Sequence, residues 1–306
     1  MKFAPALVNG RVYVGSGDGW VYCLEATTGR RLWRFRAAPA ERKIPIYGSL
    51  YSTWPVGSGV LVHDGVAYAA AGMANYDGTH VYALDAVTGK IRWENATSGH
   101  LPAAQPDSGA GVQGNLLLHD GALYMPAGNL INVAKYELAD GKFSRYGAPN
   151  RASVLGKDLY VIDGQVRTTG YPLYWRQQDS HHITMARFPA AGGHIAVTGN
   201  QVGLADPNPN AQGQPQFKWS RPAFQEYAAV AFAENAILVA GMDWTGEGPN
   251  QRGTGGLEAI DPKDGKTLWR RALPGLPVMF GVAIDRDGRV LVSLQDGRVV
   301  CLGAGR

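Results

Sequence analysis

A phrase that occurs twice near the start of the chain, and again in parts near its end, constrains the fold more than any other feature. Residues 18–35 read DGWVYCLEATTGRRLWRF and residues 77–93 read DGTHVYALDAVTGKIRW. In the first copy Trp20, Tyr22 and Leu24 alternate with the residues between them, and this period of two predicts a β-strand. Neighbouring apolar segments, joined by tight turns that contain glycine, predict three more strands. One copy of the repeat is therefore expected to form a four-stranded antiparallel meander.

The repeat returns along the whole chain. Six steps of about 46 residues lead from Asp18 to Asp296, a spacing within the range of four-stranded propeller blades. We therefore expect an all-β fold in which residues 1–306 form a single domain, a seven-bladed β-propeller of four-stranded antiparallel blades. The last blade is expected to be incomplete, because the pattern stops after its third strand. The blades are expected at residues 4–35, 60–93, 112–146, 151–178, 183–219, 226–270 and 278–302.

Composition excludes several classes of protein. The 306 residues are 45% apolar and 18% charged, which is enough for a packed core. The 29 basic and 25 acidic side chains give a net charge of +4 without a basic stripe, so we expect no nucleic-acid partner. No apolar run approaches the roughly 20 residues of a membrane helix, and we expect no membrane span. The opening residues MKFAPALVNG lack the hydrophobic segment of a signal peptide, so we expect the chain to be part of a longer or processed parent.

The repeat also resembles that of a known family. The pattern D-G-x-V-Y-A-L-D-x-x-T-G-K-x-x-W, clearest at residues 77–93 and partial near Asp18, Gly256 and Asp296, resembles the repeat of the quinoprotein (PQQ) dehydrogenases. It is similar to that of the propeller lipoprotein of bacterial outer-membrane assembly, which this chain resembles more. The resemblance implies a β-propeller in the bacterial cell envelope, in a periplasmic or extracellular location. It does not fix the activity, because catalytic and non-catalytic proteins share this repeat.

Two departures from the family bear on the cofactor. The relatives resemble eight-bladed rings, and an eighth blade would need roughly 46 more residues. The dehydrogenase resemblance also implies a vicinal cysteine pair and a calcium site beside PQQ. Here Cys23 and Cys301 occupy the same repeat position in two blades, and we interpret both as small core residues. We therefore expect no PQQ and no PQQ-dependent dehydrogenase; no cofactor is predicted, and a divalent metal is the alternative.

The lengths of the connections predict which side of the blades binds a partner. Turns between the first and second strands and between the third and fourth strands are short, whereas the opposite side receives long connections. Long loops on a rigid scaffold are where binding usually occurs, so we expect the binding site on this long-connection side. The long connections are expected at residues 36–59, 72–77, 95–114, 179–185 and 242–255.

Cationic and aromatic residues are mixed in the first of these connections. Aromatic rings stack on ligands and arginine grips carboxylates in a bidentate manner, so the mixture suits an acidic sugar or another carboxylate. The alternative is that the loop packs its own aromatic side chains over the channel mouth. A second connection, near residues 244–247, has a similar character. The predicted ligand-binding residues are Arg42, Lys43, Tyr47, Trp54, Trp244 and Glu247.

The histidines divide into two groups. His63 and His119 lie in equivalent H-D-G turns on the short-turn side, and this repetition predicts a structural role. Several others lie on the long-connection side, where they could hold a divalent metal, or be solvated or bonded to loop backbone. The candidate metal ligands are His80, His100, Asp179, His181 and His182, and the candidate catalytic residues are His100, His181 and His182. The tryptophans expected to form a packing girdle on the fourth strands are Trp33, Trp93, Trp219 and Trp269.

Two functions remain open at this point. The leading hypothesis is a non-catalytic propeller module that binds a protein partner or ligand through the long-connection side. The alternative is a carbohydrate-active enzyme, either a lyase or a hydrolase, with its site on the same side. A bound metal ion could assist its reaction. In that alternative Arg42 and Lys43 would clamp a carboxylate of the carbohydrate ligand.

Overall fold

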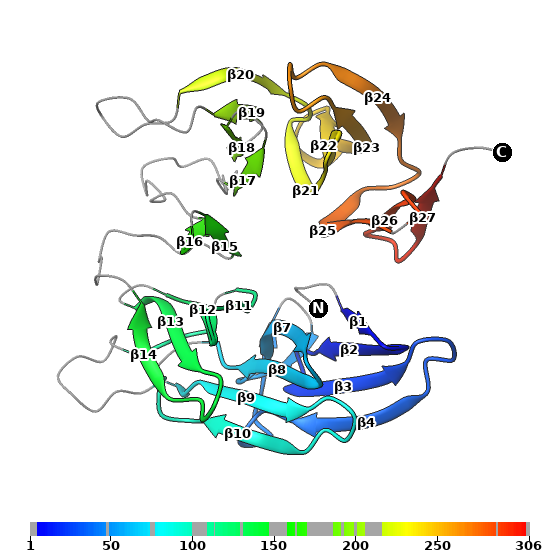
Figure 1. Cartoon of the computed structure of the whole chain (residues 1–306). Coiled ribbons are helices and arrows are strands. Elements are labelled where there is room, and N and C mark those ends of the chain that lie inside the picture. Colours follow the sequence, from blue (N-terminus) through cyan, green and yellow to red (C-terminus); the bar gives the residue numbers. More distant parts are fainter. Residues whose placement is uncertain are drawn as a thin grey trace. The chain divides into compact units, whose positions relative to one another are not determined.

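The computed structural model consists almost entirely of β-strands. It describes residues 5–46, 49–73, 77–99, 109–112, 114–128, 131–146, 158–162, 164–169, 186–190, 193–198, 201–205, 216–285 and 287–303. The chain divides into two compact units, unit 1 over Met1–Tyr174 and unit 2 over Trp175–Arg306. Figure 1 labels most of the strands of the two units.

Unit 1 contains four consecutive antiparallel sheets, each of which is called a blade below. Blade 1 is β1 (Ala6–Val8), β2 (Arg11–Gly15), β3 (Trp20–Glu25) and β4 (Arg31–Arg36). Blade 2 is β7 (Val56–His63), β8 (Val66–Ala71), β9 (His80–Asp85) and β10 (Ile91–Asn95). Blade 3 is β11 (Leu117–His119), β12 (Ala122–Gly128), β13 (Asn132–Glu137) and β14 (Phe143–Tyr146). Blade 4 is the pair β15 (Asp158–Ile162) and β16 (Gln165–Thr169), and a separate hairpin is formed by β5 (Lys43–Ile46) and β6 (Ser49–Ser52).

Unit 2 continues the series with three more sheets. Blade 5 is β17 (Ala186–Ala190), β18 (Gly193–Thr198), β19 (Gln201–Ala205) and β20 (Phe217–Pro222). Blade 6 is β21 (Glu226–Ala233), β22 (Ala236–Thr245), β23 (Arg252–Ile260) and β24 (Thr267–Ala272). Blade 7 is β25 (Pro277–Ile284), β26 (Val290–Leu294) and β27 (Val299–Leu302). The all-β class and its four-stranded antiparallel blades are therefore confirmed, whereas a ring of seven blades stays a prediction.

The turn chemistry explains why these segments form meanders. The first-to-second-strand turns use Asn9-Gly10, Asp64-Gly65 and Asp120-Gly121, and all six residues have positive φ, between 43° and 72°. Positive φ at both central residues is the type I′ geometry, whose twist matches that of a β-hairpin. The next short turn lies beside it, because the amide of Ala86 donates to the oxygen of Gly65 at 2.9 Å. The two short turns of a blade therefore share one edge, as the sequence predicted.

The fourth-strand tryptophans join each blade to the next. The indole Nε1 of Trp33 donates to the oxygen of Ala86 at 3.1 Å, and that of Trp93 to the oxygen of Leu138 at 2.8 Å. In unit 2, the Nε1 of Trp219 donates to the oxygen of Pro262 at 3.2 Å. Each acceptor lies in the third-to-fourth-strand turn of the following blade. The packing role predicted for these three tryptophans is confirmed.

The cores lie between adjacent blades. One cluster joins blades 1 and 2 and contains Cys23 and Leu84; others join blades 2 and 3, blades 5 and 6, and blades 6 and 7. Cys23 is fully buried, as predicted, whereas Cys301 is exposed, so the prediction of a core role for Cys301 is wrong. The reason is that Val300 and Leu302 face the cluster shared with blade 6, so the alternation of β27 turns Cys301 to the opposite face.

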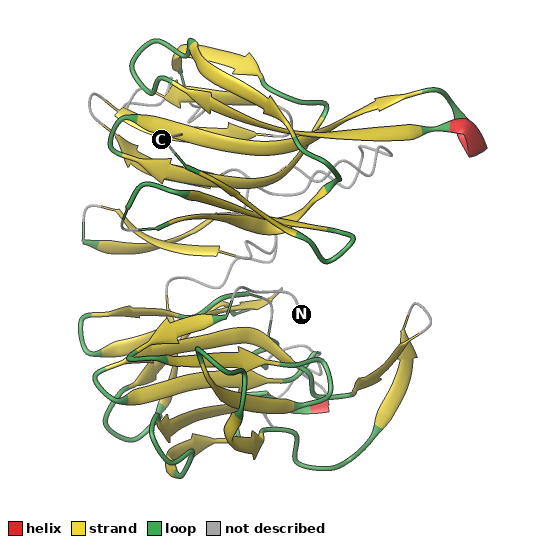
Figure 2. Ribbon diagram, turned by 90° about the vertical axis from the view of Figure 1, so that its right-hand side faces the viewer, coloured by secondary structure: helices red, strands yellow, loops and turns green. Residues whose placement is uncertain are grey.

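The predicted loop at residues 242–255 is wrong for most of its length. Strands β22 and β23 continue through it and pair Trp244 with Gly253, so that only a short turn with a 3₁₀ helix at Gly248–Asn250 remains (Figure 2). A Cβ added to Gly253 would lie 2.7 Å from the ring of Trp244. Gly253, one of the glycines that suggested a loop, leaves room for the aromatic ring that lies across the strand. Similarly, part of the connection at residues 36–59 is the β5–β6 hairpin.

Candidate functional site

Two of the predicted ligand-binding residues form the base of the β5–β6 hairpin. The Nη2 of Arg42 donates to Oδ1 of Asp77 at 2.6 Å, and its Nε donates to Oγ1 of Thr53 at 2.9 Å. Its guanidinium carbon lies 4.7 Å from the ring centroid of Trp54, within the range of a cation–π contact. Trp54 is buried, and its Nε1 donates to the backbone oxygen of Asp77 at 2.6 Å. These two side chains therefore fasten the hairpin base to the segment that precedes β9 of blade 2.

The hairpin itself rises from this base with an apolar surface. Residues pair across it as Ile44 with Tyr51 and Pro45 with Leu50, and Leu50 is 69% exposed. The ring of Tyr51 packs on Gly17, where an added Cβ would lie 2.5 Å from it. A two-stranded hairpin alone is marginally stable in water, so this anchorage is what fixes the position of Leu50. Lys43, also a predicted ligand residue, pairs with Glu41 at 3.3 Å.

His80 lies where β9 begins, with 14% of its side chain exposed. Its Nδ1 is buried without a hydrogen-bond partner, 3.7 Å from Oε1 of Glu94, and its ring stacks on Tyr82 with the centroids 6.4 Å apart. Burial lowers the pKa of His80 from its ordinary value, and Glu94 opposes this shift. Burial therefore favours the neutral form of His80.

The other predicted metal and catalytic residues lie outside the part of the chain that the structure describes, so their positions relative to His80 stay a prediction. Among the described residues, no group of three or more His, Cys, Asp or Glu side chains could hold a metal ion. The candidates that lie outside the described residues are Tyr47, His100, Asp179, His181 and His182. His119 contacts the backbone oxygen of Gly164 at 3.1 Å, which agrees with the structural role predicted for it.

The second predicted aromatic residue belongs to unit 2 and is fixed by its own sheet. The Nε1 of Trp244 donates to Oε2 of Glu226 at 3.0 Å, and its backbone N–H donates to Oε1 of Gln225 at 2.8 Å. Glu247 is exposed at the tip of the β22–β23 hairpin, where it precedes the 3₁₀ helix. Trp244 therefore stiffens the hairpin and leaves Glu247 as the predicted ligand residue that is open to solvent there.

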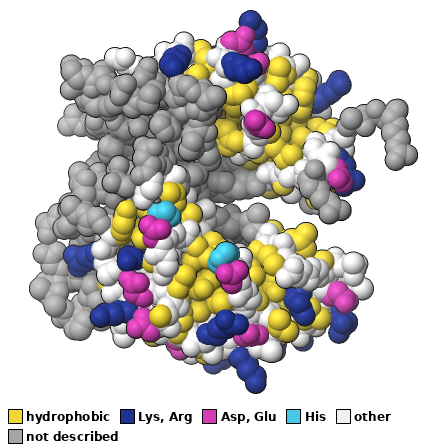
Figure 3. Space-filling view, viewed as in Figure 1, with side chains coloured by type: hydrophobic (Ala, Val, Ile, Leu, Met, Phe, Trp, Pro, Cys, Tyr) yellow, Lys and Arg dark blue, Asp and Glu magenta, His cyan; other side chains and the backbone are white. Residues whose placement is uncertain are grey.

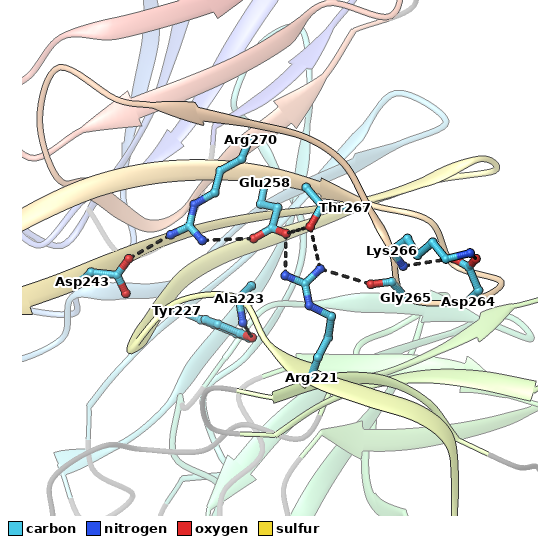
Figure 4. Close-up of polar contacts among 10 residues, drawn as sticks. All are labelled: Arg221, Ala223, Tyr227, Asp243, Glu258, Asp264, Gly265, Lys266, Thr267 and Arg270. Atoms are coloured by element: carbon cyan, nitrogen blue, oxygen red, sulfur yellow. Dashed lines mark hydrogen bonds and ion pairs between the residues drawn. The ribbon is translucent and has the colours of Figure 1, made fainter.

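Sequence reasoning missed a buried ionic network between blades 5 and 6 (Figure 4). Glu258 is 1% exposed, and its Oε1 accepts from Nη2 of Arg221 at 2.6 Å and from Oγ1 of Thr267 at 2.5 Å. The Nη1 of Arg270 lies 3.6 Å from Oε2 of Glu258, and its Nη2 donates to Oδ2 of Asp243 at 2.9 Å. Two guanidinium groups from different strands thus compensate one buried carboxylate.

The repeat gives the signal that could have revealed this network. Glu258 occupies the position that Tyr82 has in blade 2, and Arg221 occupies that of Phe35 in blade 1. Phe35 and Tyr82 form an edge-to-face aromatic pair with centroids 4.9 Å apart. An ion pair has therefore replaced an aromatic pair at the same interblade contact. A glutamate within an otherwise apolar strand pattern, with an arginine one blade earlier, indicates this exchange.

The described residues do not fit a PQQ pocket. The resemblance implies a vicinal cysteine pair and a calcium site, but Cys23 lies in the core of blade 1 and Cys301 lies on β27 in the other unit. Acidic, cysteine and histidine side chains form no cluster of metal-ligand size in the described ranges. No step of a reaction is therefore assigned to PQQ.

The protein is thus a repeat protein built of β-propeller blades. Comparison with known proteins shows which family its repeat resembles. Residues 2–152 match the family model described as PQQ_2, outer membrane protein assembly factor BamB. The expected resemblance to the PQQ-like repeat family is therefore confirmed over these residues.

Two enzymes are also similar to parts of the chain. Polyvinylalcohol dehydrogenase of Sphingopyxis sp. is 29% identical over 120 residues, which are 39% of this chain and 15% of that enzyme. The dehydrogenase subunit of the quinone alcohol dehydrogenase of Acetobacter aceti is 24% identical over 176 residues, 50% of this chain and 22% of that subunit. The chain therefore matches only a small part of the length of either enzyme.

The chain is also similar to solved structures, at low identity and with TM-scores below 0.5. BamB from Moraxella catarrhalis is 13% identical with a TM-score of 0.44, covering 97% of this chain and 70% of that one. Quinohemoprotein alcohol dehydrogenase from Comamonas testosteroni is 14% identical with a TM-score of 0.46, covering 100% and 60%. The computationally designed Ika8 protein is 14% identical with a TM-score of 0.47, covering 97% and 94%.

Proposed function

We propose that this protein is a non-catalytic binding module that engages a protein partner through the β5–β6 hairpin on the long-connection side of unit 1. One observation carries the proposal: the polar groups expected to grip a ligand are used inside the protein, while an apolar side chain is presented outward. Arg42 is bonded to Asp77 and Thr53, and the indole of Trp54 to Asp77, whereas Leu50 is 69% exposed. A fixed, exposed apolar anchor suits a protein interface.

The charge distribution and the comparisons support the same proposal. Basic and acidic side chains are interspersed with hydrophobic ones on the face drawn in Figure 3, and the net charge is +4. Mixed charge with apolar anchors is the character of a protein-binding surface. Within the described residues, no helix has the length and apolar character needed to span a bilayer. We propose a bacterial cell-envelope protein with a periplasmic or extracellular location, because the matching family model is named for an outer membrane assembly factor.

A site-specific crosslinking experiment tests this proposal. A photo-reactive amino acid is placed at position 50, on the hairpin, and in a matched control at position 87, on the short-turn side. Both native side chains, Leu50 and Val87, are well exposed, at 69% and 56%. The proposal expects a discrete protein adduct from position 50 in the native envelope and none from position 87. Equal adducts from both positions, or none from position 50, would show that the hairpin is not the interface.

The alternative proposal, a carbohydrate-active enzyme with protein-bound metal or acid–base residues, has one supporting observation. Burial lowers the pKa of His80, whose Nδ1 lies 3.7 Å from Oε1 of Glu94, and a histidine beside a carboxylate is an arrangement that general bases use. The carboxylate clamp is less available, because Arg42 and Lys43 already pair with Asp77 and Glu41. Turnover of acidic oligosaccharides that disappears in His80→Ala would establish the enzyme.

A further inference from the structure

The two strands of the β5–β6 hairpin differ in how their outer edges are protected. An exposed strand edge pairs readily with other chains, and proteins protect such edges with lysine, other charged residues and proline. Strand β5 has both devices, because it contains Lys43 and the exposed Pro45. Strand β6 reads Ser-Leu-Tyr-Ser and contains neither a proline nor a charge. Among the described residues β6 pairs with β5 alone, so no described strand lies along its other edge.

Hydrogen bonds at the base of the hairpin show which backbone groups face the outer edge of β6. The amide of Thr53 donates to the oxygen of Arg42, across the hairpin, at 2.9 Å. The amide of Ser52 instead donates at 2.8 Å to the oxygen of Gly17, which lies between β2 and β3 of blade 1. Because backbone groups alternate in direction along an antiparallel strand, the N–H and C=O of Leu50 also point away from β5. Leu50 therefore offers one donor and one acceptor at this edge.

The residue opposite Leu50 disfavours the same contact at the other edge. Pro45 pairs with Leu50 across the hairpin, so the backbone of Pro45 faces the outer edge of β5. Proline has no N–H, and it therefore removes the donor that another residue would present there. The addition of a strand is thus favoured at the edge of β6 and disfavoured at the edge of β5.

The side chains of the hairpin lie on two faces. The ring of Tyr51 packs against Gly17, so the face that carries Tyr51 lies against blade 1. Side chains alternate along a strand, which places Leu50 and its partner Pro45 on the opposite face, and Leu50 is 69% exposed there. A strand that pairs with the backbone of Leu50 would therefore also cover its side chain. A third strand would stabilise the hairpin, because a two-stranded sheet is marginal in water.

We propose that an extended segment of the partner protein pairs with the outer edge of β6 and becomes the third strand of the hairpin. This inference rests on the function proposed for the hairpin, and it specifies the form in which the partner binds. Main-chain hydrogen bonds to the N–H and C=O of Leu50 hold the segment, and an apolar side chain beside Leu50 gives specificity. Gly17 already occupies the edge at Ser52, so Leu50 is the first residue of β6 beyond that contact that the added strand pairs with.

Crosslinking in variants of the full chain tests whether the backbone of Leu50 holds the partner. A photo-reactive amino acid is placed at position 43, because Lys43 is a diagonal neighbour of Leu50 on the same face. Leu50→Pro removes the outward N–H, whereas Leu50→Val keeps this N–H and has an apolar side chain of similar size to proline. The yield of the protein adduct in the native envelope is expected to be about tenfold lower with Leu50→Pro and nearly unchanged with Leu50→Val.

Two controls accompany these variants. Pro45→Ala adds an N–H to the outer edge of β5 and is expected to leave the adduct unchanged, because the partner does not use that edge. The melting temperatures of purified Leu50→Pro and Leu50→Val are expected to be close to that of the unsubstituted chain, because the N–H of Leu50 makes no bond to β5.

The possible failures of this inference and of the proposed function are distinguishable. No adduct from either position 43 or position 50 in the unsubstituted chain would overturn both, because the hairpin would not be the interface. An adduct that Leu50→Pro and Leu50→Val retain equally would keep the hairpin as the interface but overturn the strand pairing. Equal loss in both variants would also overturn the pairing, because the contact would then depend on the leucine side chain. An adduct with a second copy of the chain would show that the edge binds that copy and not a different protein.

Discussion

Replacement of Glu258 by glutamine tests whether the buried ionic network holds blades 5 and 6 together. The substitution keeps the shape of the side chain and removes the charge that Arg221 and Arg270 share. Breaking a fully buried ion pair costs roughly 3–5 kcal/mol, because it leaves an uncompensated charge. Here the two arginine side chains are 29% and 46% exposed, so water can solvate them in part, and we expect a cost of about 2–3 kcal/mol.

The assay is thermal and urea unfolding, followed by the fluorescence of the tryptophans. A cost of this size corresponds to a melting temperature lower by about 3–5 °C in a chain of this length. The difference is expected to persist at 1 M NaCl, since buried pairs are screened far less than exposed ones. A matched control is Asp77→Asn, which breaks the pair between Asp77 and Arg42, whose side chains are 27% and 54% exposed. That pair is expected to contribute at most about 1 kcal/mol and to lose its contribution in high salt.

The repeat supplies a rescue variant. Arg221→Phe combined with Glu258→Tyr transplants the Phe35–Tyr82 pair into the interface of blades 5 and 6. Hydrophobic replacement of a buried ion pair is often neutral or stabilising, so the double variant is expected to be at least as stable as the wild type. If Glu258→Gln is as stable as the wild type, or if the double variant is less stable than the single one, the network does not carry the interface.

Three further outcomes follow from the described contacts. Gly89→Ala is expected to destabilise the protein by at least about 1 kcal/mol more than Gly10→Ala in urea unfolding. Both glycines have φ 71°, but only the first lies against an indole, so equal costs would show that the indole contact is irrelevant. His80 has a lowered pKa, so the unfolded chain binds its proton more readily, and stability is expected to fall as pH drops below about 6.5. His80→Phe should remove this part of the pH dependence of unfolding, and an unchanged profile would contradict the assignment. Cys23→Ser places a hydroxyl in a core and is expected to lower the melting temperature, whereas Cys301→Ser on the exposed strand is not; calorimetry on the two variants distinguishes them.

The sequence by itself determined the blades, because their causes are local. A period of two, turns such as Asn9-Gly10, and the spacing of the tryptophans specify four-stranded meanders, and the structure has them where the repeat predicts. The sequence also indicated that Trp33 and Trp93 are packing residues, because repetition at one position of the repeat indicates a structural role.

Tertiary structure alone decided how the polar side chains are used. Arg42 was predicted to grip a ligand, and it bonds instead to Asp77, which lies 35 residues away in the sequence. Glu258 was not singled out, yet its buried carboxylate joins two blades. Cys23 and Cys301 share a repeat position, but one has a further blade against its face and the other does not within the described part of unit 2. The partner of a side chain across blades depends on which segments the fold brings together, and a local pattern carries no information about that neighbour.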